Sequence, residues 1–250
     1  MPPRYEILGV EGLPEIKRDD DLAGLIAEAA RAQQTPLEAA DLLVISQKIV
    51  SKSEGRVVKL GDINPSPLAA EMAAELGRDP RLVEIILRES RRVVRRDKGV
   101  LIVETHHGWI CANAGVDQSN VDADTACLLP EDSDRSAGRL RQRLRRLTGH
   151  DLGIIVADTF GRPWREGLTN VAIGVAGLDP LRSYLGEKDP AGHVLQATIL
   201  ALADELAGAA EPVMGKLDRI PVAIIRGLDW PRGEGGSRGL LRDPARDLFR

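Results

Sequence analysis

The chain has 250 residues, of which 43% are hydrophobic and 29% charged, and its formal net charge is -4. This length can bury a sizeable core, and we expect a single domain over residues 1–250. The negative charge argues against nucleic acid as the main partner. The apolar runs fall short of the ~20 residues of a membrane span, and no secretory segment is evident at the start, so we expect a cytoplasmic protein.

Apolar runs and helical stripes alternate along the chain, which predicts an α/β or mixed α+β fold. The expected strands lie at residues 5–10, 42–45, 100–103, 109–112, 152–157 and 221–226. The expected helices lie at residues 22–30, 66–76, 80–96, 135–147 and 194–207. Residues 135–146 carry six arginines and no acid, but leucines recur at helical spacing, so we expect an amphipathic helix with a solvated basic face. The glycine-rich residues 232–239 predict a mobile loop.

Asp117 and Asp158 each follow an apolar run, where the end of a strand would present a carboxylate to a cleft. Two such acids that converge can hold Mg²⁺ or Mn²⁺ through oxygen ligands and leave positions open for phosphate. For either acid alone, a helix N-cap or a turn is the more common role. The pair together therefore predicts a metal site that neither acid predicts singly.

Several familiar motifs are missing, namely the phosphate-binding G-x-x-x-x-G-K-[ST] loop, G-x-G-x-x-G, H-E-x-x-H and G-x-S-x-G. Five polar clusters that follow or flank apolar runs remain, at residues 11–14, 46–52, 113–120, 158–165 and 214–216. Together they could surround one anionic ligand. Cys111 and Cys127, the two cysteines, give no zinc pattern, and we expect both to be small buried or half-buried residues rather than a redox pair.

These clusters resemble, in order and spacing, the coenzyme F420-0:L-glutamate ligases, also called gamma-glutamyl ligases. The resemblance covers nearly the whole chain. It is carried by EGLPEI, ISQKIVSKSEGR, NAGVDQSNV, VADTFGRPWREGLTNVAIGVAGL, ADELAGAAEPVMGK and PVAIIRG. Some relatives fuse this module to a nitroreductase-like domain, and we expect the stand-alone form here.

The resemblance implies an acid–amino-acid ligase of coenzyme F420 biosynthesis that uses GTP and releases GDP and phosphate. It would join L-glutamate to a carboxylate of coenzyme F420-0 through an acyl phosphate, and then add further gamma-linked glutamates. Two divalent ions, Mg²⁺ or Mn²⁺, are implied, and K⁺ is a possible further ion. The implied fold has mixed sheets and forms an intertwined homodimer.

The resemblance also assigns residues. It makes Asp117 and Asp158 metal ligands that act in catalysis with Lys52, and Thr159 a ligand of the second metal. The implied nucleotide contacts are Glu11, Gly12, Leu13, Pro14, Ser46, Gln47, Lys52, Asn120, Met214, Gly215 and Lys216. A protonated lysine cannot ligate a cation, so Lys216 would act through its backbone or on a phosphate. We add Arg162 and Arg165 as candidates for the acidic tail of the deazaflavin substrate.

Two other functions remain open from the residues alone. A phosphohydrolase would use the same metal acids and would not require glutamate. A non-catalytic nucleotide-binding module would bind the metal and the nucleotide without turnover.

Overall fold

The computed structural model describes residues 4–97, 99–119 and 121–247. The helices are α1 (Leu22–Ala32), α2 (Gln47–Ser53), α3 (Pro67–Leu76), α4 (Pro80–Arg88), α5 (Ser133–Thr148) and α6 (Leu202–Met214). The strands are β1 (Glu6–Gly9), β2 (Leu42–Ser46), β3 (Val57–Lys59), β4 (Ser90–Asp97), β5 (Val100–Thr105), β6 (Ile110–Ala112), β7 (Thr125–Cys127), β8 (Gly153–Arg162), β9 (Arg165–Ala176), β10 (Arg182–Ser183), β11 (Ile199–Leu200) and β12 (Val222–Arg226). Among these helices, none combines the length and the apolar character needed to span a membrane.

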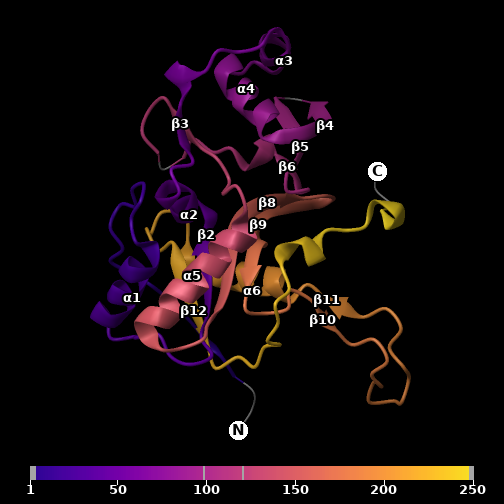
Figure 1. Cartoon of the computed structure of the whole chain (residues 1–250). Coiled ribbons are helices and arrows are strands. Elements are labelled where there is room, and N and C mark those ends of the chain that lie inside the picture. The colour runs from indigo at the N-terminus through magenta and orange to yellow at the C-terminus, as the bar shows by residue number, and fades with distance from the viewer. Residues whose placement is uncertain (1–3, 98, 120, 248–250) are drawn as a thin grey trace.

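A five-stranded mixed sheet forms the centre of the molecule, in the order β1-β12-β2-β8-β9. Only the β2–β8 pair is parallel, and the other neighbours are antiparallel. Helices α1 and α5 cover one face and α6 covers the other (Figure 1). The expected α/β class with mixed sheets is confirmed.

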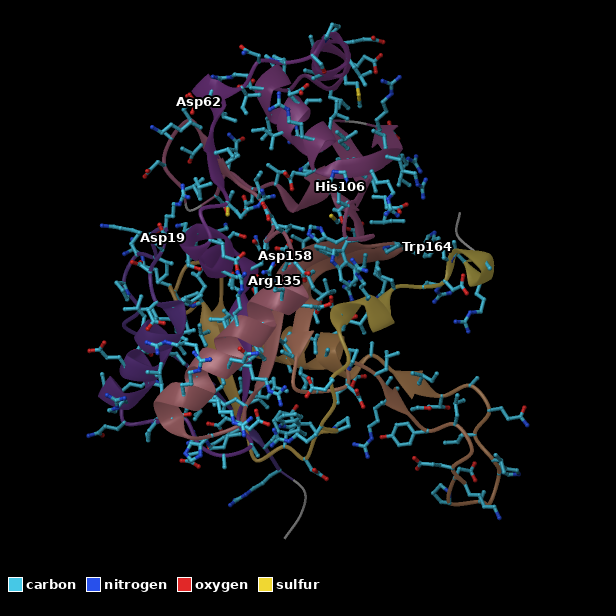
Figure 2. All side chains as sticks on the ribbon, viewed as in Figure 1. Asp19, Asp62, His106, Arg135, Asp158 and Trp164 are labelled. Atoms are coloured by element: carbon cyan, nitrogen blue, oxygen red, sulfur yellow. The ribbon has the colours of Figure 1, made fainter. Side chains whose placement is uncertain are left out.

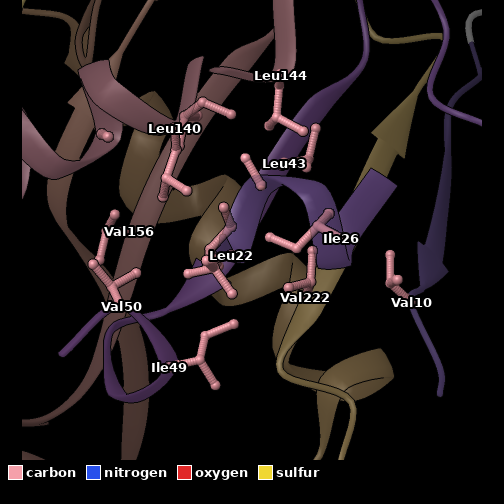
Figure 3. Close-up of a cluster of buried hydrophobic side chains, with 14 of the residues drawn as sticks. Val10, Leu22, Ile26, Leu43, Ile49, Val50, Leu140, Leu144, Val156 and Val222 are labelled. Atoms are coloured by element: carbon pink, nitrogen blue, oxygen red, sulfur yellow. The ribbon is translucent and has the colours of Figure 1, made fainter. Parts of the chain in front are cut away.

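Residues of the central strands alternate between two cores, because successive side chains of a strand point to opposite faces. In β2, Leu43 and Ile45 pack with α1 and α5, as Figure 3 shows for that cluster, whereas Leu42 and Val44 pack with α6. All four are fully buried. The continuous apolar run therefore predicted correctly a strand buried on both faces.

A second group of elements sits above one edge of the central sheet (Figure 1). It contains α3, α4 and the antiparallel sheet β4-β5-β6, with the β3–β7 pair leading into it. A separate apolar core, which includes Met72, Ile86 and Leu101, holds it together. Strand β6 contacts β8, so this group rests on the central sheet.

The helix expected over residues 80–96 is wrong beyond Arg88, where α4 ends and β4 follows. The apolar stripe of α4 does not continue, since Val93 is 37% exposed. Instead β4 pairs with β5, and Arg92 donates to Glu104 across the two strands at 2.8 Å. A pairing partner that follows in the chain thus outweighs local helical spacing.

The helix expected over residues 194–207 is also wrong in its position, since α6 spans Leu202–Met214. Residues before it form β11, which pairs with β10. The helix continues through Pro212 in its last turn because Leu206, Ala210 and Met214 pack into the core beneath it. Tertiary packing here overrides a residue that usually ends a helix.

Residues 232–239 contain little regular structure, as expected, but they are held against β9. Asp134 accepts hydrogen bonds from the amides of Val175 (2.8 Å) and Ser237 (2.9 Å), and the Ser237 hydroxyl donates to Ile173. Their mobility stays a prediction. The intertwined dimer also stays a prediction.

Candidate active site

Four central strands bring polar segments to the same edge of the sheet. The register pairs Gly9 of β1 with Ala223 near the start of β12, and Ser46 at the end of β2 with Ala157 of β8. The amide of Ser46 also donates to the carbonyl of Pro221, just before β12. The clusters at residues 11–14, 46–52, 158–159 and 214–216 therefore all emerge at this edge, which we call the site edge.

The segment after β1 is fastened to α2 and to the end of α1. Lys52 forms an ion pair with Glu15, and the amide of Glu11 donates to the side chain of Gln33 at 2.8 Å. Gly12 has φ +75°, and space around its missing Cβ is open, so its backbone can approach a ligand closely. The segment at residues 46–52, expected only as a polar cluster, is largely helical as α2. That helix places Lys48 and Lys52 one turn apart on the same face.

Asp117 follows β6 after a turn with an unusual backbone. Asn113, Ala114 and Gly115 have φ values of 56°, 56° and 70°. A Cβ on Gly115 would lie 2.7 Å from Leu129, so only glycine fits there. The turn directs the chain into the pairing of Asp117 with Cys127, and this pairing fixes the carboxylate over α2.

Lys48 reaches across from α2 to this carboxylate. Its Nζ donates to Asp117 Oδ2 at 2.6 Å, and to the carbonyl and hydroxyl of Ser119 at 2.9 and 2.7 Å. The Ser119 amide donates to Asp117 Oδ1 at 2.7 Å. Burial raises the pKa of Asp117, but the hydrogen bonds from Lys48 and Ser119 outweigh it, and the net pKa is lowered. Asp117 is therefore held as a carboxylate.

Asp158 lies in β8, one residue past the point where β2 ends, rather than after the strand as expected. Figure 2 shows it at the junction between the central sheet and the group that carries β5 and β6. Burial and the nearby charge of Asp117 raise its pKa from 3.8 to about 6. The charge of Asp158 in turn adds to burial in raising the pKa of Cys111 on β6 to about 12. The two acids are thus close enough to repel one another, which favours a cation between them.

Thr159, the next residue, engages the opposite side of the strand. Its hydroxyl donates to Asn170 Oδ1 at 2.7 Å and accepts a hydrogen bond from Lys216 Nζ at 2.6 Å. Asn170 Nδ2 donates to Glu211 Oε2 at 2.7 Å, and Lys216 lies 3.2 Å from Glu211 Oε1. Four side chains from β8, β9, α6 and the segment after it close a ring, which we call the Lys216 ring.

Some predicted site residues are not presented to a ligand here. Gln47 is buried and accepts from Ser51 at 2.9 Å, and Met214 is buried in the core beneath α6. Asn120 lies outside the described residues. Arg162 and Arg165 lie at the exposed end of the β8–β9 hairpin, and Figure 2 shows Trp164, between them, well away from Asp158. Both cysteines are buried, as expected.

Three residues of the site were missed from the sequence. Lys48 stands within ISQKIVSK, but its direction became clear only once α2 was a helix. Asn170 lies outside the strands expected from the sequence, and Glu211 lies beyond the helix expected over residues 194–207. No spacing links them, because their side chains meet where α6 packs against β9. Only long-range packing brings them to Thr159.

The two aspartates suit one divalent ion. Among the described residues there is no group of three or more His, Cys, Asp or Glu side chains arranged to hold a metal. Mg²⁺ is commonly bound by one or two carboxylates with water and substrate phosphates completing its shell. Asp117 and Asp158 provide such a pair, provided that Lys48 moves from Asp117 toward an added phosphate. At Thr159 the Lys216 ammonium already contacts the hydroxyl oxygen, so a second divalent ion there would have to displace it.

The site brings acidic and basic side chains together at one edge of a mixed α/β sheet, and comparison with known proteins gives the class of protein, a ligase. The family model described as F420-0:Gamma-glutamyl ligase matches residues 12–227. The chain belongs to this family. It is 46% identical over 247 residues to the coenzyme F420:L-glutamate ligase of Methanothermobacter thermautotrophicus, covering 98% of each chain. It is 47% identical to the enzyme of that name from Methanopyrus kandleri, covering 97% of this chain and 98% of the relative.

Proposed function

We propose that this chain joins L-glutamate to a carboxylate of coenzyme F420-0 in coenzyme F420 biosynthesis, with GTP as the energy source. Further gamma-linked glutamates would follow on the same site, in the cytoplasm. Nearly full-length similarity to two relatives named coenzyme F420:L-glutamate ligase supports the choice of substrates. The convergence of Asp117 and Asp158 at the site edge, with Lys48 between α2 and Asp117, is the observation that carries the chemistry.

An ionised carboxylate resists attack by an amine, so the reaction needs activation. Transfer of the γ-phosphoryl group from GTP to the substrate carboxylate gives an acyl phosphate and GDP. The glutamate amine then forms the C–N bond, the C–O bond to phosphate breaks, and the amine releases a proton. Both steps involve phosphoryl oxygens whose charge must be neutralised and whose positions must be fixed.

The residues of the chain divide this task. Asp117 and Asp158 would hold a divalent ion, Mg²⁺ or Mn²⁺, which supplies charge neutralisation of the phosphates. Lys48 is placed to exchange Asp117 for a phosphate oxygen, and Lys52 stands one turn further along α2. The backbone at Gly12 is available for close contact with the nucleotide, since the space beside its Cα is open, whereas the Asp218 carboxylate fills the corresponding space at Gly215.

We also propose that Arg162 and Arg165 contact the acidic tail of the deazaflavin substrate. Arg162 is four residues beyond Asp158 in β8, about 13 Å along an extended strand, so the two arginines would contact only a long acidic tail. A role for K⁺ stays a prediction. A homodimer would be excluded if gel filtration gave the mass of one chain.

The experiment is direct. The protein is incubated with GTP, Mn²⁺ or Mg²⁺, L-glutamate and the unglutamylated deazaflavin, and products are resolved by mass spectrometry. We expect a ladder of added glutamates with stoichiometric GDP. GDP release that does not depend on glutamate or deazaflavin would instead indicate a phosphohydrolase, and nucleotide binding without turnover would indicate a binding module.

Asp158→Ala supplies the control for the site. One preorganised electrostatic contact to a transition state is worth about 3 kcal/mol, so we expect at least about a hundredfold loss of kcat/KM. The circular dichroism spectrum should be unchanged. A folded Asp158→Ala protein with full turnover would remove this carboxylate from the reaction.

A further inference from the structure

Lys216 places a positive charge where a second cation would otherwise stand. Its Nζ lies 2.6 Å from the Thr159 hydroxyl oxygen and 3.2 Å from a Glu211 carboxylate oxygen. The position of this Nζ is therefore close to both a hydroxyl and a carboxylate oxygen, and oxygen atoms of these kinds are the usual ligands of hard cations. In this chain an ammonium occupies that point.

The other members of the Lys216 ring leave Thr159 and Glu211 little freedom to serve a different ion. The Thr159 hydroxyl hydrogen is directed to Asn170, and the second Glu211 oxygen accepts from the Asn170 amide. Asn170 is only 5% exposed. A buried amide therefore fixes the two oxygens in the orientation in which Lys216 contacts both.

The Lys216 ammonium of the ring also lies close enough to Asp158, one of the two carboxylates of the proposed metal site, to act on its charge. Thr159 is adjacent in sequence to Asp158, and the Lys216 charge acts on the Asp158 carboxyl as well as on Glu211. A divalent ion at Thr159 would meet the ammonium at contact distance and be repelled. Lys216 itself is 58% exposed, so its ammonium can also turn toward a phosphate bound at the site edge.

We infer that the Lys216 ammonium takes the place of one of the two cations in this chain, so that one divalent ion binds per chain and Lys216 supplies the second positive charge to the nucleotide phosphates. The inference rests on the proposed function for the presence of nucleotide and metal. It predicts a metal stoichiometry that a single side chain controls.

Metal counting tests this inference without turnover. Each protein is dialysed with excess Mn²⁺ and a non-hydrolysable GTP analogue, and bound Mn²⁺ is measured by native mass spectrometry and elemental analysis. The wild type should hold one Mn²⁺ per chain. Lys216→Glu, which adds a carboxylate where the ammonium stood, should hold two, and electron paramagnetic resonance should show a coupled Mn²⁺ pair.

Lys188→Glu is the matched control, because it makes the same charge change at an exposed residue of the β10–β11 segment. It should hold one Mn²⁺, like the wild type. Two Mn²⁺ per wild-type chain, or one in Lys216→Glu, would overturn the inference while leaving the ligase proposal in place. Failure of every protein to bind Mn²⁺ with the nucleotide analogue would overturn both.

Discussion

Asp158 and Asp117 should respond to removal of their charge with opposite changes in stability. Asp158 is a strand residue whose pKa burial and the Asp117 charge raise from 3.8 to about 6. Between these two values the unfolded chain releases the proton while the folded chain keeps it, so stability is lost as pH rises toward 6. Asp158→Asn removes that loss.

The magnitude follows from the two pKa values. At pH 5 the ionisation of Asp158 costs the fold about 2 kcal/mol, and above pH 7 it costs about 3 kcal/mol. Asp158→Asn should therefore raise the free energy of unfolding by up to these amounts. For a chain of this size, about 3 kcal/mol corresponds to a rise in Tm of about 6–12 °C.

The assay is denaturation of both proteins with EDTA present, at pH 5 and pH 7.5. Asp117→Asn is the paired variant. The pKa of Asp117 is lowered by Lys48 and Ser119, so its carboxylate stabilises the fold above pH 3.8 and that contribution is lost as pH falls through the lowered value. Asp117→Asn should thus destabilise at pH 7.5. A destabilised Asp158→Asn at pH 7.5, or a gain that does not grow with pH, would refute the reasoning.

Three further changes test other parts of the structure. Lys48→Met removes the ammonium that contacts Asp117 and should lower kcat/KM about a hundredfold in the glutamate-ladder assay; a change under threefold would exclude a phosphate role. Arg226→Met removes the guanidinium that contacts both carboxylate oxygens of Asp41, whose side chain is 1% exposed. Urea denaturation should show a loss of about 3 kcal/mol in the free energy of unfolding, and adding Asp41→Asn should restore part of it. Gly115→Ala sets a Cβ against Leu129 at positive φ, and should cost about 1–3 kcal/mol by the same measurement.

The sequence was sufficient for elements whose own residues determine them. The apolar run 42–45 can only be satisfied by burial on both faces, and helix α1 has its apolar stripe and its Asp21 cap within one segment. For residues 80–96, local sequence patterns are not sufficient. Their helical spacing is real as far as Arg88, but β4 owes its existence to β5, a partner that no pattern within β4 reveals.

The site residues also differ in whether a local sequence pattern indicates them. Asp117 and Asp158 were recognised as candidates because short acids after apolar runs are local signals, and their sharing of a metal stays a prediction. The two lysine ammonium groups that contact the site, by contrast, carry no local sequence signal. Lys48 reaches Asp117 from 69 residues away and Lys216 reaches Thr159 from 57 residues away, and each lysine taken alone resembles a surface charge.

The two lysines contact the site in different ways, and in the proposed reaction this difference would affect how the nucleotide binds. Lys48 neutralises the Asp117 carboxylate, which the proposed metal ion would also use, so we expect metal and nucleotide to bind together, with the ammonium moving from Asp117 to phosphate. Lys216 contacts oxygens that are fixed by a buried amide, so it can remain while phosphate arrives. Metal affinity without nucleotide should therefore be weak in the wild type and rise in Lys48→Met, even though that variant loses turnover. Isothermal titration with Mn²⁺ alone measures this, and an unchanged or lower affinity in Lys48→Met would show that Lys48 does not compete with the metal.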